Sequence, residues 1–376
     1  MNGCGYMNIK KAERNSSFEL LRILMMIQII FLHVCDKGGY DEAALALGGF
    51  HLHFEYAVWY LCRCPVYIFF ILTGYFLIKN EMNFEQVKKR ILKIYIPMYF
   101  YTLIIPIVML IFNMCSLSDI NIGRTLFPFF SREWYFLTGY ILVIIFSPYL
   151  NKLAKSLTKK EFKTLLFILI GIFSIWMALA NLKPLSDFIS LNQIISNCGG
   201  KSLYNYIMMY LLGAYLRMYC SKNNKPKLRY LFIFVLCALC QCIAVKLYHP
   251  YLNISGYNDN LFVIIQCICL ILFFKDLNFK SKVINYISTF TLEIYIIHEH
   301  YIFKYYMWDN IFPMHNMSFY NVWYYPVKIL IICIIVFVSC MLIEIIRRKL
   351  FDLILYFIKK VKNYKEKSLC DDMYVN

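Results

Sequence analysis

Long apolar runs separated by short polar segments follow one another through most of this chain. Ten runs come near the twenty or so residues with which a helix crosses a hydrocarbon core of about 30 Å. We predict their bounds at 17–35, 57–78, 94–114, 134–150, 164–181, 203–219, 229–246, 260–275, 283–302 and 326–346. Because backbone inside a bilayer must satisfy its own hydrogen bonds, this pattern predicts an all-α integral membrane protein with about ten transmembrane helices.

The basic residues of the polar segments support this arrangement. Of 39 Lys and Arg residues, 29 fall in alternate segments that start with the N-terminus and end with the C-terminus. Only 7 fall in the intervening segments, and 3 lie inside the runs. Because positive charge gathers in cytoplasmic loops, both termini are predicted to be cytoplasmic. The net charge of +17 therefore reflects membrane topology, and we expect no nucleic-acid partner.

The same pattern predicts the domain organisation. Residues 1–346 should form one transmembrane domain, and residues 347–376 a basic cytoplasmic tail. In that tail an apolar stretch at 350–358 precedes five lysines, a pattern that fits an interfacial helix on anionic lipid and equally a solvated tail. The basic N-terminus resembles a signal peptide, but its apolar run holds charged residues and no small-residue cleavage site follows. We therefore expect an uncleaved anchor in a multi-pass protein.

Composition adds little beyond the membrane assignment. Hydrophobic residues make up 61% of the chain and charged residues only 16%, against about 25% in ordinary soluble domains. The fifteen cysteines lie mostly inside apolar runs, which is unlike the loop positions of a disulfide framework. We expect them to act as small packing residues.

The first apolar run carries ionisable residues that are costly inside a bilayer and usually face a protein interior. They are Glu19, Arg22 and His33. His33 lies eleven positions after Arg22, so an ideal helix places both side chains on one face, about 16 Å apart along the axis. Glu19 lies three residues before Arg22 and is expected to pair with it.

Other polar residues are expected to gather at the outer membrane level. Arg63 lies beside Pro65, which should kink the second run, and Trp134 and Tyr135 begin the fourth. The ninth run ends in His298, Glu299 and His300. Arg63 has a simpler interpretation as an ion-pair partner of Glu293 or Glu299. The pairs His51/His53 and His298/His300 offer four imidazoles for a metal, although nothing fixes their spacing.

A basic cluster precedes the third run on the predicted cytoplasmic side. Arg90 and Lys93 are three residues apart and therefore share a helical face ahead of Pro97. Such a pair is suited to a phosphorylated cytosolic ligand, and ordinary topogenic charge is the alternative interpretation.

An ordered set of motifs resembles the membrane acyltransferase-3 family. The family's N-terminal signature is matched by NSSFELLR (15–22) followed by His33. Further similar segments are PVYIFFILTGYFLI (65–78), RILKIYIPMYF (90–100), REWYFLTGYILVIIFSPYL (132–150), MMYLLGAYLR (208–217) and TFTLEIYIIH (289–298). The chain departs from the family pattern at Thr73 (usually Ser), Lys93 (usually Arg) and Val34 (often a second His).

The resemblance implies an enzyme that moves an acyl group, commonly acetyl, from cytosolic acyl-CoA to a hydroxyl. Typical acceptors are sugars of exopolysaccharide, capsule or O-antigen, lipid-linked sugars, or peptidoglycan, and many members lie in bacterial plasma membranes. No metal is expected, and oligomeric state is left open.

Candidate roles follow for the residues named above. We expect His33 to act as general base, with Glu19 orienting Arg22, which contacts the donor or polarises its thioester. Arg90 and Lys93 would hold the CoA phosphates. Arg63, Trp134, Tyr135 and His298 would line the acceptor side. The alternative functions are a transporter or flippase for a lipid-linked glycan, or a polysaccharide polymerase; the short outer segments disfavour the polymerase.

Overall fold

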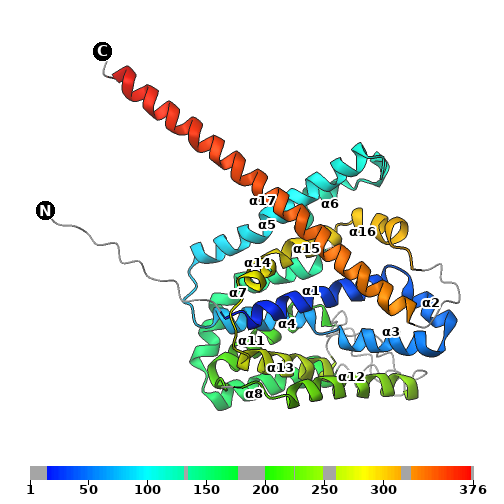
Figure 1. Cartoon of the computed structure of the whole chain (residues 1–376). Helices are drawn as coiled ribbons and strands as arrows, with labels where there is room; N and C mark the ends of the chain where they lie inside the picture. The colour runs from blue at the N-terminus through cyan, green and yellow to red at the C-terminus, as the bar shows by residue number, and fades with distance from the viewer. Residues whose placement is uncertain are drawn as a thin grey trace.

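The fold is a bundle of helices, seen in the computed structural model, which describes residues 15–130, 134–176, 200–223, 225–248, 260–314 and 323–373 (Figure 1). Over these ranges all regular elements are helical, in agreement with the predicted all-α class. The α-helices are α1 (Ser17–Asp36), α2 (Tyr40–Leu47), α3 (Gly49–Leu61), α4 (Pro65–Leu77), α5 (Phe84–Ile111), α6 (Ile122–Leu126), α7 (Tyr135–Ser156), α8 (Lys159–Ile170), α11 (Leu203–Tyr219), α12 (Arg229–Tyr248), α13 (Leu261–Asp276), α14 (Lys282–Ile287), α15 (Thr291–His298), α16 (Phe303–Tyr306) and α17 (Tyr324–Met373). Short 3₁₀ or π turns lie at Leu117–Asp119 (η1), Pro128–Phe130 (η2), Gly171–Trp176 (η3), Ser288–Phe290 (η6) and Met307–Ile311 (η7).

Five of the described helical segments are long and apolar enough to cross a membrane. They are Ser17–Asp36, Gly49–Leu77, Phe84–Ile111, Tyr135–Ser156 and Tyr324–Ile358. The remaining predicted runs also coincide with helical segments, but over the described residues these do not reach the length and apolar character of a membrane span. The protein is therefore a multi-pass membrane protein, while the number of ten crossings stays a prediction.

Two predicted runs are interrupted. The second is divided between α3 and α4, and Pro65 is the first residue of α4, where its missing N–H costs no helical hydrogen bond. This confirms the kink expected there. The ninth was predicted as one helix over 283–302 but consists of α14, η6 and α15, and α15 ends at His298. This early end leaves Glu299 outside the helix as its C-cap residue.

Helix α17 is the longest element and runs obliquely across the bundle, with its C-terminal half extending beyond it (Figure 1). It continues without a break from the last predicted span into the predicted tail, through residues 347–373. The position of this second half relative to the membrane stays a prediction.

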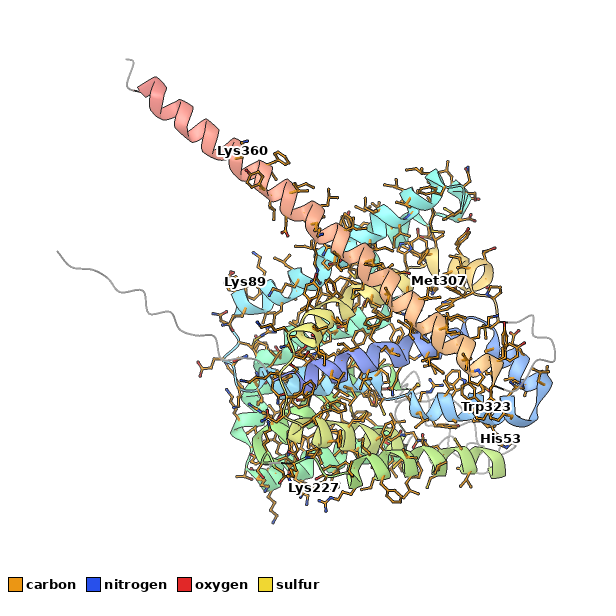
Figure 2. All side chains as sticks on the ribbon, in the orientation of Figure 1. His53, Lys89, Lys227, Met307, Trp323 and Lys360 are labelled. Carbon is orange, nitrogen blue, oxygen red and sulfur yellow. The ribbon has the colours of Figure 1, made fainter. Side chains whose placement is uncertain are left out.

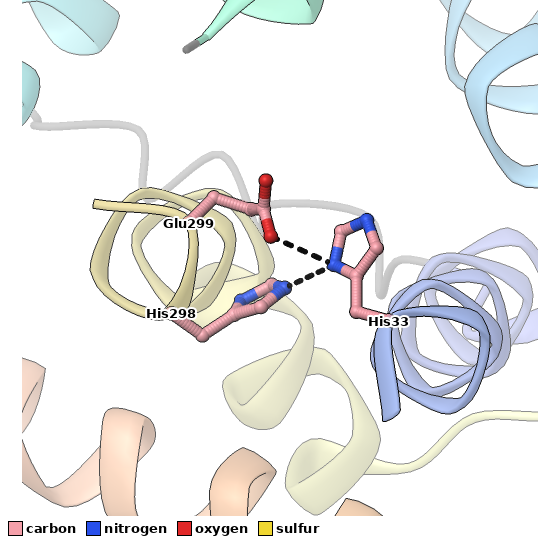
Figure 3. Close-up of side chains that lie close together, drawn as sticks. All are labelled: His33, His298 and Glu299. Carbon is pink, nitrogen blue, oxygen red and sulfur yellow. Dashed lines mark hydrogen bonds and ion pairs between the residues drawn. The ribbon is translucent and has the colours of Figure 1, made fainter. Parts of the chain in front are cut away.

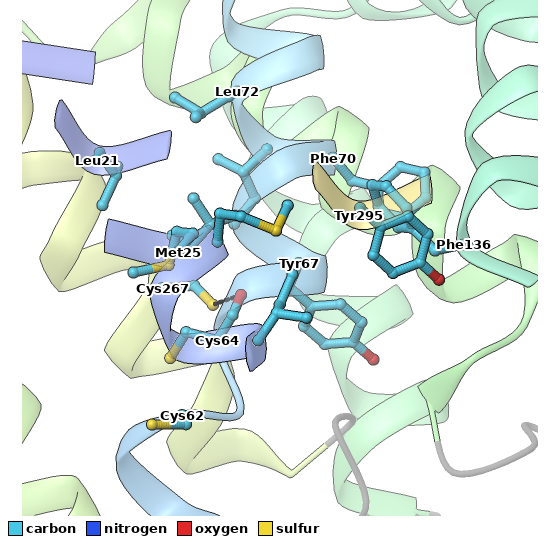
Figure 4. Packing of buried hydrophobic residues seen from close by; sticks show 14 of the residues in the cluster. Leu21, Met25, Cys62, Cys64, Tyr67, Phe70, Leu72, Phe136, Cys267 and Tyr295 are labelled. Carbon is cyan, nitrogen blue, oxygen red and sulfur yellow. Dashed lines mark hydrogen bonds between the residues drawn. The ribbon is translucent and has the colours of Figure 1, made fainter. Parts of the chain in front are cut away.

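The centre of the bundle is α4, which packs against α1, α7, α11 and α13. Helices α4 and α11 touch backbone to backbone, because Gly74 faces the carbonyl of Tyr210 and Gly213 faces that of Ile71. Large aromatic rings fill the space towards α7, where Phe70 meets Phe136 edge to face at 5.6 Å between ring centroids (Figure 4).

The cysteines that the structure describes carry free thiols, and most of them are buried. Cys64 and Cys267, both fully buried, meet where α4 packs against α13 (Figure 4). They fill small spaces in this contact, as expected for packing residues.

Hydrogen bonds fix the start of α1 to the segment that follows α13. The backbone N–H of Ser16 donates to the carbonyl of Phe279, and the side chain of Asn15 donates to that of Leu277. This contact places Glu19 beside Ser288, whose hydroxyl donates to the Glu19 carboxylate at 2.8 Å. The first turn of α1 and the break before α15 thus form one unit.

Candidate active site

His33 lies near the end of α1, where α15 brings two polar side chains against it (Figure 3). Its Nδ1 atom is 3.1 Å from Nε2 of His298 and 3.0 Å from Oε1 of Glu299. Both partners are buried, and His33 is partly exposed. Residues 265 positions apart meet here because α1 packs directly against α15.

The hydrogen bonds of this cluster indicate where its protons lie. Nδ1 of His298 is 2.6 Å from the carbonyl oxygen of Ile294, which only accepts, so this nitrogen carries the hydrogen. In neutral His298 the Nε2 atom is then an acceptor, and the Nδ1–H of His33 donates towards it and towards Glu299. The Nε2 lone pair of His33 remains, and Figure 3 shows this nitrogen turned away from both partners. One ring nitrogen of His33 is thereby held in place, and the other remains a potential proton acceptor.

Lys37, the C-cap residue of α1, lies one turn after His33 and completes the cluster. Its ammonium group donates to both oxygens of Glu299 at 2.5 Å. Glu299 therefore joins a lysine and a histidine four residues apart in sequence. This ion pair fixes the carboxylate that in turn fixes His33.

A cavity of about 400 Å³, here called the histidine cavity, opens beside this cluster. Its walls include His33, Lys37 and Glu299, together with Arg63 and Tyr135. The structure thus brings three of the predicted site residues (His33, Arg63 and Tyr135) to one space. Such a volume falls in the range of small-molecule sites.

Positive charge dominates the walls of the histidine cavity. Lys37, Arg63, Lys201 and Lys304 line it against Asp36 and Glu299. The guanidinium of Arg63 lies 3.7 Å from the centre of the Trp59 ring, which holds it in place. Burial, together with the nearby charges of Arg63 and Lys37, lowers the pKa of Lys201. Developing negative charge would be stabilised in such a space.

A second cavity of about 240 Å³, the arginine cavity, contains the basic residues predicted to bind the donor. Arg22, Arg90 and Lys93 all line it. Glu19 accepts a hydrogen bond from Arg22 at 2.7 Å, which confirms the pairing expected from their spacing. Arg22 also lies over the ring of Phe76, at 5.4 Å from its centre.

The two cavities are neighbours. Phe136 of α7 and Tyr295 of α15 belong to the walls of both. The rings of these two residues meet edge to face at 5.4 Å. Among the described residues, the side chains shared by the two walls are thus aromatic, and they mark the place where the two cavities approach each other.

Some predicted residues lie elsewhere. Trp134 is only 1% exposed and packs edge-on against His300 at 5.8 Å, away from the described walls of both cavities. His298 lies behind His33 as its hydrogen-bond partner and not on the cavity wall. Their positions in the sequence predict that both lie at the outer membrane level. In the structure both side chains are buried against other residues of the protein.

The structure supports neither the ion pair considered for Arg63 nor the metal site of four histidines. Arg63 was considered as a partner of Glu293 or Glu299, but Glu293 lies 3.3 Å from Arg348 of α17. Glu299 instead holds Lys37. Among the described residues the convergent group of potential metal ligands is His33, His298 and Glu299, without the expected His51 and His53. His51 is hydrogen-bonded to the hydroxyl of Tyr40.

Sequence reasoning gave no role to several residues of the histidine cavity. Lys37 follows His33 by four positions, so helical spacing could have placed it on the same face. Lys201 and Tyr295 carry no such local signal, because the tertiary contacts of α11 and α15 bring them to the cavity.

Comparison with known proteins agrees with the motifs. A family model described as an acyltransferase domain matches residues 15–345, nearly the whole chain. Neither curated proteins nor solved structures give a match. The matched range contains α1 through most of the membrane part of α17, and with it both cavities. The chain belongs to the acyltransferase-3 family of membrane acyltransferases.

Proposed function

We propose that this protein is an O-acyltransferase that carries an acyl group, most simply acetyl, from cytosolic acyl-CoA to a hydroxyl of a cell-surface or lipid-linked carbohydrate. The observation that carries the proposal is the orientation of His33, which lines the histidine cavity: its Nδ1 is held by His298 and Glu299, while its Nε2 is turned away from both (Figure 3).

In the proposed reaction Nε2 of His33 takes the proton of the acceptor hydroxyl as its oxygen attacks the thioester carbonyl. The developing imidazolium is stabilised by the Glu299 carboxylate on the opposite side of the ring. Cationic side chains of the cavity stabilise the oxyanion of the tetrahedral intermediate. Collapse breaks the carbon–sulfur bond, and His33 returns its proton to the departing CoA thiolate.

The donor would enter through the arginine cavity. Arg90 and Lys93 are exposed at its mouth and provide charge for the CoA phosphates, with Arg22 further along the acyl-CoA arm. Phe136 and Tyr295 then bound the passage through which the thioester must reach His33. The extended arm of acyl-CoA would span the distance of about 16 Å between Arg22 and His33 that helix geometry predicts.

The proposed orientation puts the arginine cavity on the cytoplasmic side and the histidine cavity towards the outside. Lys89 and Lys360 lie towards one side of the molecule, and His53 and Trp323 lie on the other (Figure 2). This separation agrees with the positive-inside rule for cytoplasmic termini in a bacterial plasma membrane.

We further propose that His33, His298 and Glu299 hold a proton and not a metal ion. Their donor atoms lie within 4.8 Å of one another, as ligands of a metal would. However, the Lys37 ammonium already occupies both oxygens of Glu299 and would repel a second cation. Treatment with a chelator is therefore expected to leave the rate of acyl transfer unchanged.

Comparison of surface polysaccharides by NMR, from cells with and without the protein, tests the function. Loss of one O-acyl signal on removal, restored by the wild-type protein but not by His33→Ala, is the expected result. A folded His33→Ala protein that restores the signal fully would contradict the role of His33. Movement of intact glycan without turnover of acyl-CoA would instead support a flippase.

A further inference from the structure

A third cavity, of about 560 Å³, lies between the segment that follows α5 and the segment that follows α15. We call it the tyrosine cavity, after the three tyrosines in its wall, Tyr301, Tyr305 and Tyr306. None of the residues assigned to acyl transfer lines it within the described parts of the chain. Its volume is that of a small-molecule site.

The polar side chains of this cavity are mixed in kind. Asp119, Asn121, Arg124, Asp309 and Asn310 all line it. Two hydrogen bonds from Ser116 hold the pKa of Asp119 below its usual range, so this carboxylate is an acceptor at neutral pH. One guanidinium against two carboxylates does not make an anion site, and a phosphate or phospholipid headgroup would be a poor ligand.

The walls are fixed to each other. The hydroxyl of Tyr301 lies 2.8 Å from that of Thr125, which joins the α6 segment to the α16 segment. The guanidinium of Arg124 lies 6.0 Å from the centre of the Tyr301 ring. Next along the chain, the π turn η7 buries Trp308 and leaves Asp309 and Asn310 exposed. Such turns are frequent at functional sites.

Exposed aromatic rings beside carboxylate and amide groups suit a polyhydroxylated ligand. The apolar faces of sugar rings pack on aromatic side chains, while their hydroxyls donate to carboxylate or amide oxygens. Tyr305 offers such a ring, since 58% of its surface is exposed.

The tyrosine cavity is connected to the proposed reaction site through α16. Lys304 is buried and lines the histidine cavity, whereas the next residue, Tyr305, lines the tyrosine cavity. Glu299, which holds His33, precedes Tyr301 by two positions. One short segment thus contributes to both spaces.

We infer that the tyrosine cavity is a carbohydrate-binding subsite that holds sugar units of the acceptor away from the hydroxyl that reacts. The identity of the ligand as acceptor rests on the proposed function, whereas binding of carbohydrate can be tested without it. A chain of sugars lying across α16 would reach both cavities, so longer acceptors gain affinity from contacts remote from the reaction.

Binding measured in a catalytically inactive background separates the two proposals. Full-length His33→Ala protein in lipid nanodiscs is titrated with labelled surface oligosaccharides, of graded length, released from cells that carry the protein. We expect binding that strengthens with length and that the added Tyr305→Ala change weakens by about five- to tenfold. Asp309→Asn should weaken it by a smaller factor, because the amide still offers an oxygen.

Tyr286→Ala is the matched control, because Tyr286 is 56% exposed but lies on α14, outside the tyrosine cavity. Absence of binding to every oligosaccharide, or equal loss with Tyr305→Ala and Tyr286→Ala, would overturn the subsite. Binding that depends on Tyr305, together with a wild-type protein that shows no acyl-transfer activity, would support the subsite and contradict the proposed function.

Discussion

His33 is held on one side of its ring and open on the other. His298 and Glu299 compete for the same Nδ1 hydrogen, so neither alone determines the tautomer. Glu299 adds a negative charge that would favour the imidazolium of the proposed reaction, whereas His298 adds only an acceptor. The two neighbours should therefore differ in their effect on the rate.

A graded series of variants measures this difference. His33→Ala is expected to lower kcat by about 10²- to 10⁴-fold, the usual contribution of a general base. Glu299→Gln keeps an acceptor but loses the charge, and should cost about 10- to 100-fold in kcat, with His298→Ala costing less. KM for both substrates should hardly change, which acyl-transfer kinetics on purified protein would show.

The control for this series is His53→Ala, since His53 is exposed and bonded to the carbonyl of Gly49 in its own helix. Equal losses for His298→Ala and Glu299→Gln would show that the charge of Glu299 has no special role.

Asp41, outside the membrane-spanning segments, makes stability depend on pH. Burial and the charges of Glu55 and Asp36 raise its pKa to about 7. An unfolded Asp ionises near pH 4, so the unfolded state loses its proton first and stability falls as pH rises from about 4 to about 7. Asp41→Asn avoids this loss and should raise the Tm by about 2 °C at pH 8, and by less at pH 5.

Thermal unfolding of the purified protein at the two pH values checks this expectation. Glu42→Gln, at the exposed neighbouring position, is the control for the removal of one negative charge. A gain from Asp41→Asn that is the same at pH 5 and pH 8 would contradict the ionisation argument.

At the scale of elements, the contact of α4 with α11 depends on two glycines. A methyl group at Gly213 would collide with the carbonyl of Ile71, which is backbone and cannot rotate away. Gly213→Ala must therefore separate the helices, and we expect a loss of about 2 kcal/mol in the free energy of unfolding. Thermal unfolding in detergent would detect it as a lower Tm.

Gly171→Ala provides the comparison, since among the described residues no atom outside its own helical turn lies within 4 Å of the position its methyl group would take. This variant is expected to be neutral or slightly stabilised, by up to about 1 kcal/mol. Similar losses for both variants would mean that the close α4–α11 contact is not a source of stability.

Elements were predictable to the extent that their signals are local. Apolar length located the helices, and spacing on one helix gave the pairing of Glu19 with Arg22. The end of α15 at His298 was not predicted, because Tyr301 and Ile302, after three polar residues, extend the predicted run to 302. The full length of α17 was not predicted either, because the charged residues after 346 indicate the end of a membrane span there.

The site was less predictable because it depends on contacts between distant segments. Helical spacing placed Arg22 and His33 on one face but could not show that each would line a different cavity. Trp134 was expected on the acceptor side, yet its ring is packed against His300. The neighbouring helices determine which face of a helix is buried, and the sequence of one helix does not identify its neighbours.

At the scale of the whole molecule, the proposed reaction assigns the donor and the acceptor to different cavities. The arginine cavity carries the groups suited to phosphates, and the histidine cavity carries Arg63 and Lys201 beside the proposed base. If donor and acceptor enter separately, loss of charge in one cavity should change the KM of one substrate only.

Steady-state kinetics with each substrate varied in turn test this division. Removal of the two charges proposed to bind the CoA phosphates, in the Arg90→Ala/Lys93→Ala variant, should raise the KM for acyl-CoA by about 10- to 100-fold and leave that of the acceptor unchanged. Lys201→Ala should do the reverse by a smaller factor. Lys89→Ala removes a neighbouring charge of α5 that lies outside the arginine cavity, so it controls for the general attraction of CoA to a basic surface. A rise in both KM values with either variant would mean that donor and acceptor share one space, and the separate entry of the two substrates would have to be abandoned.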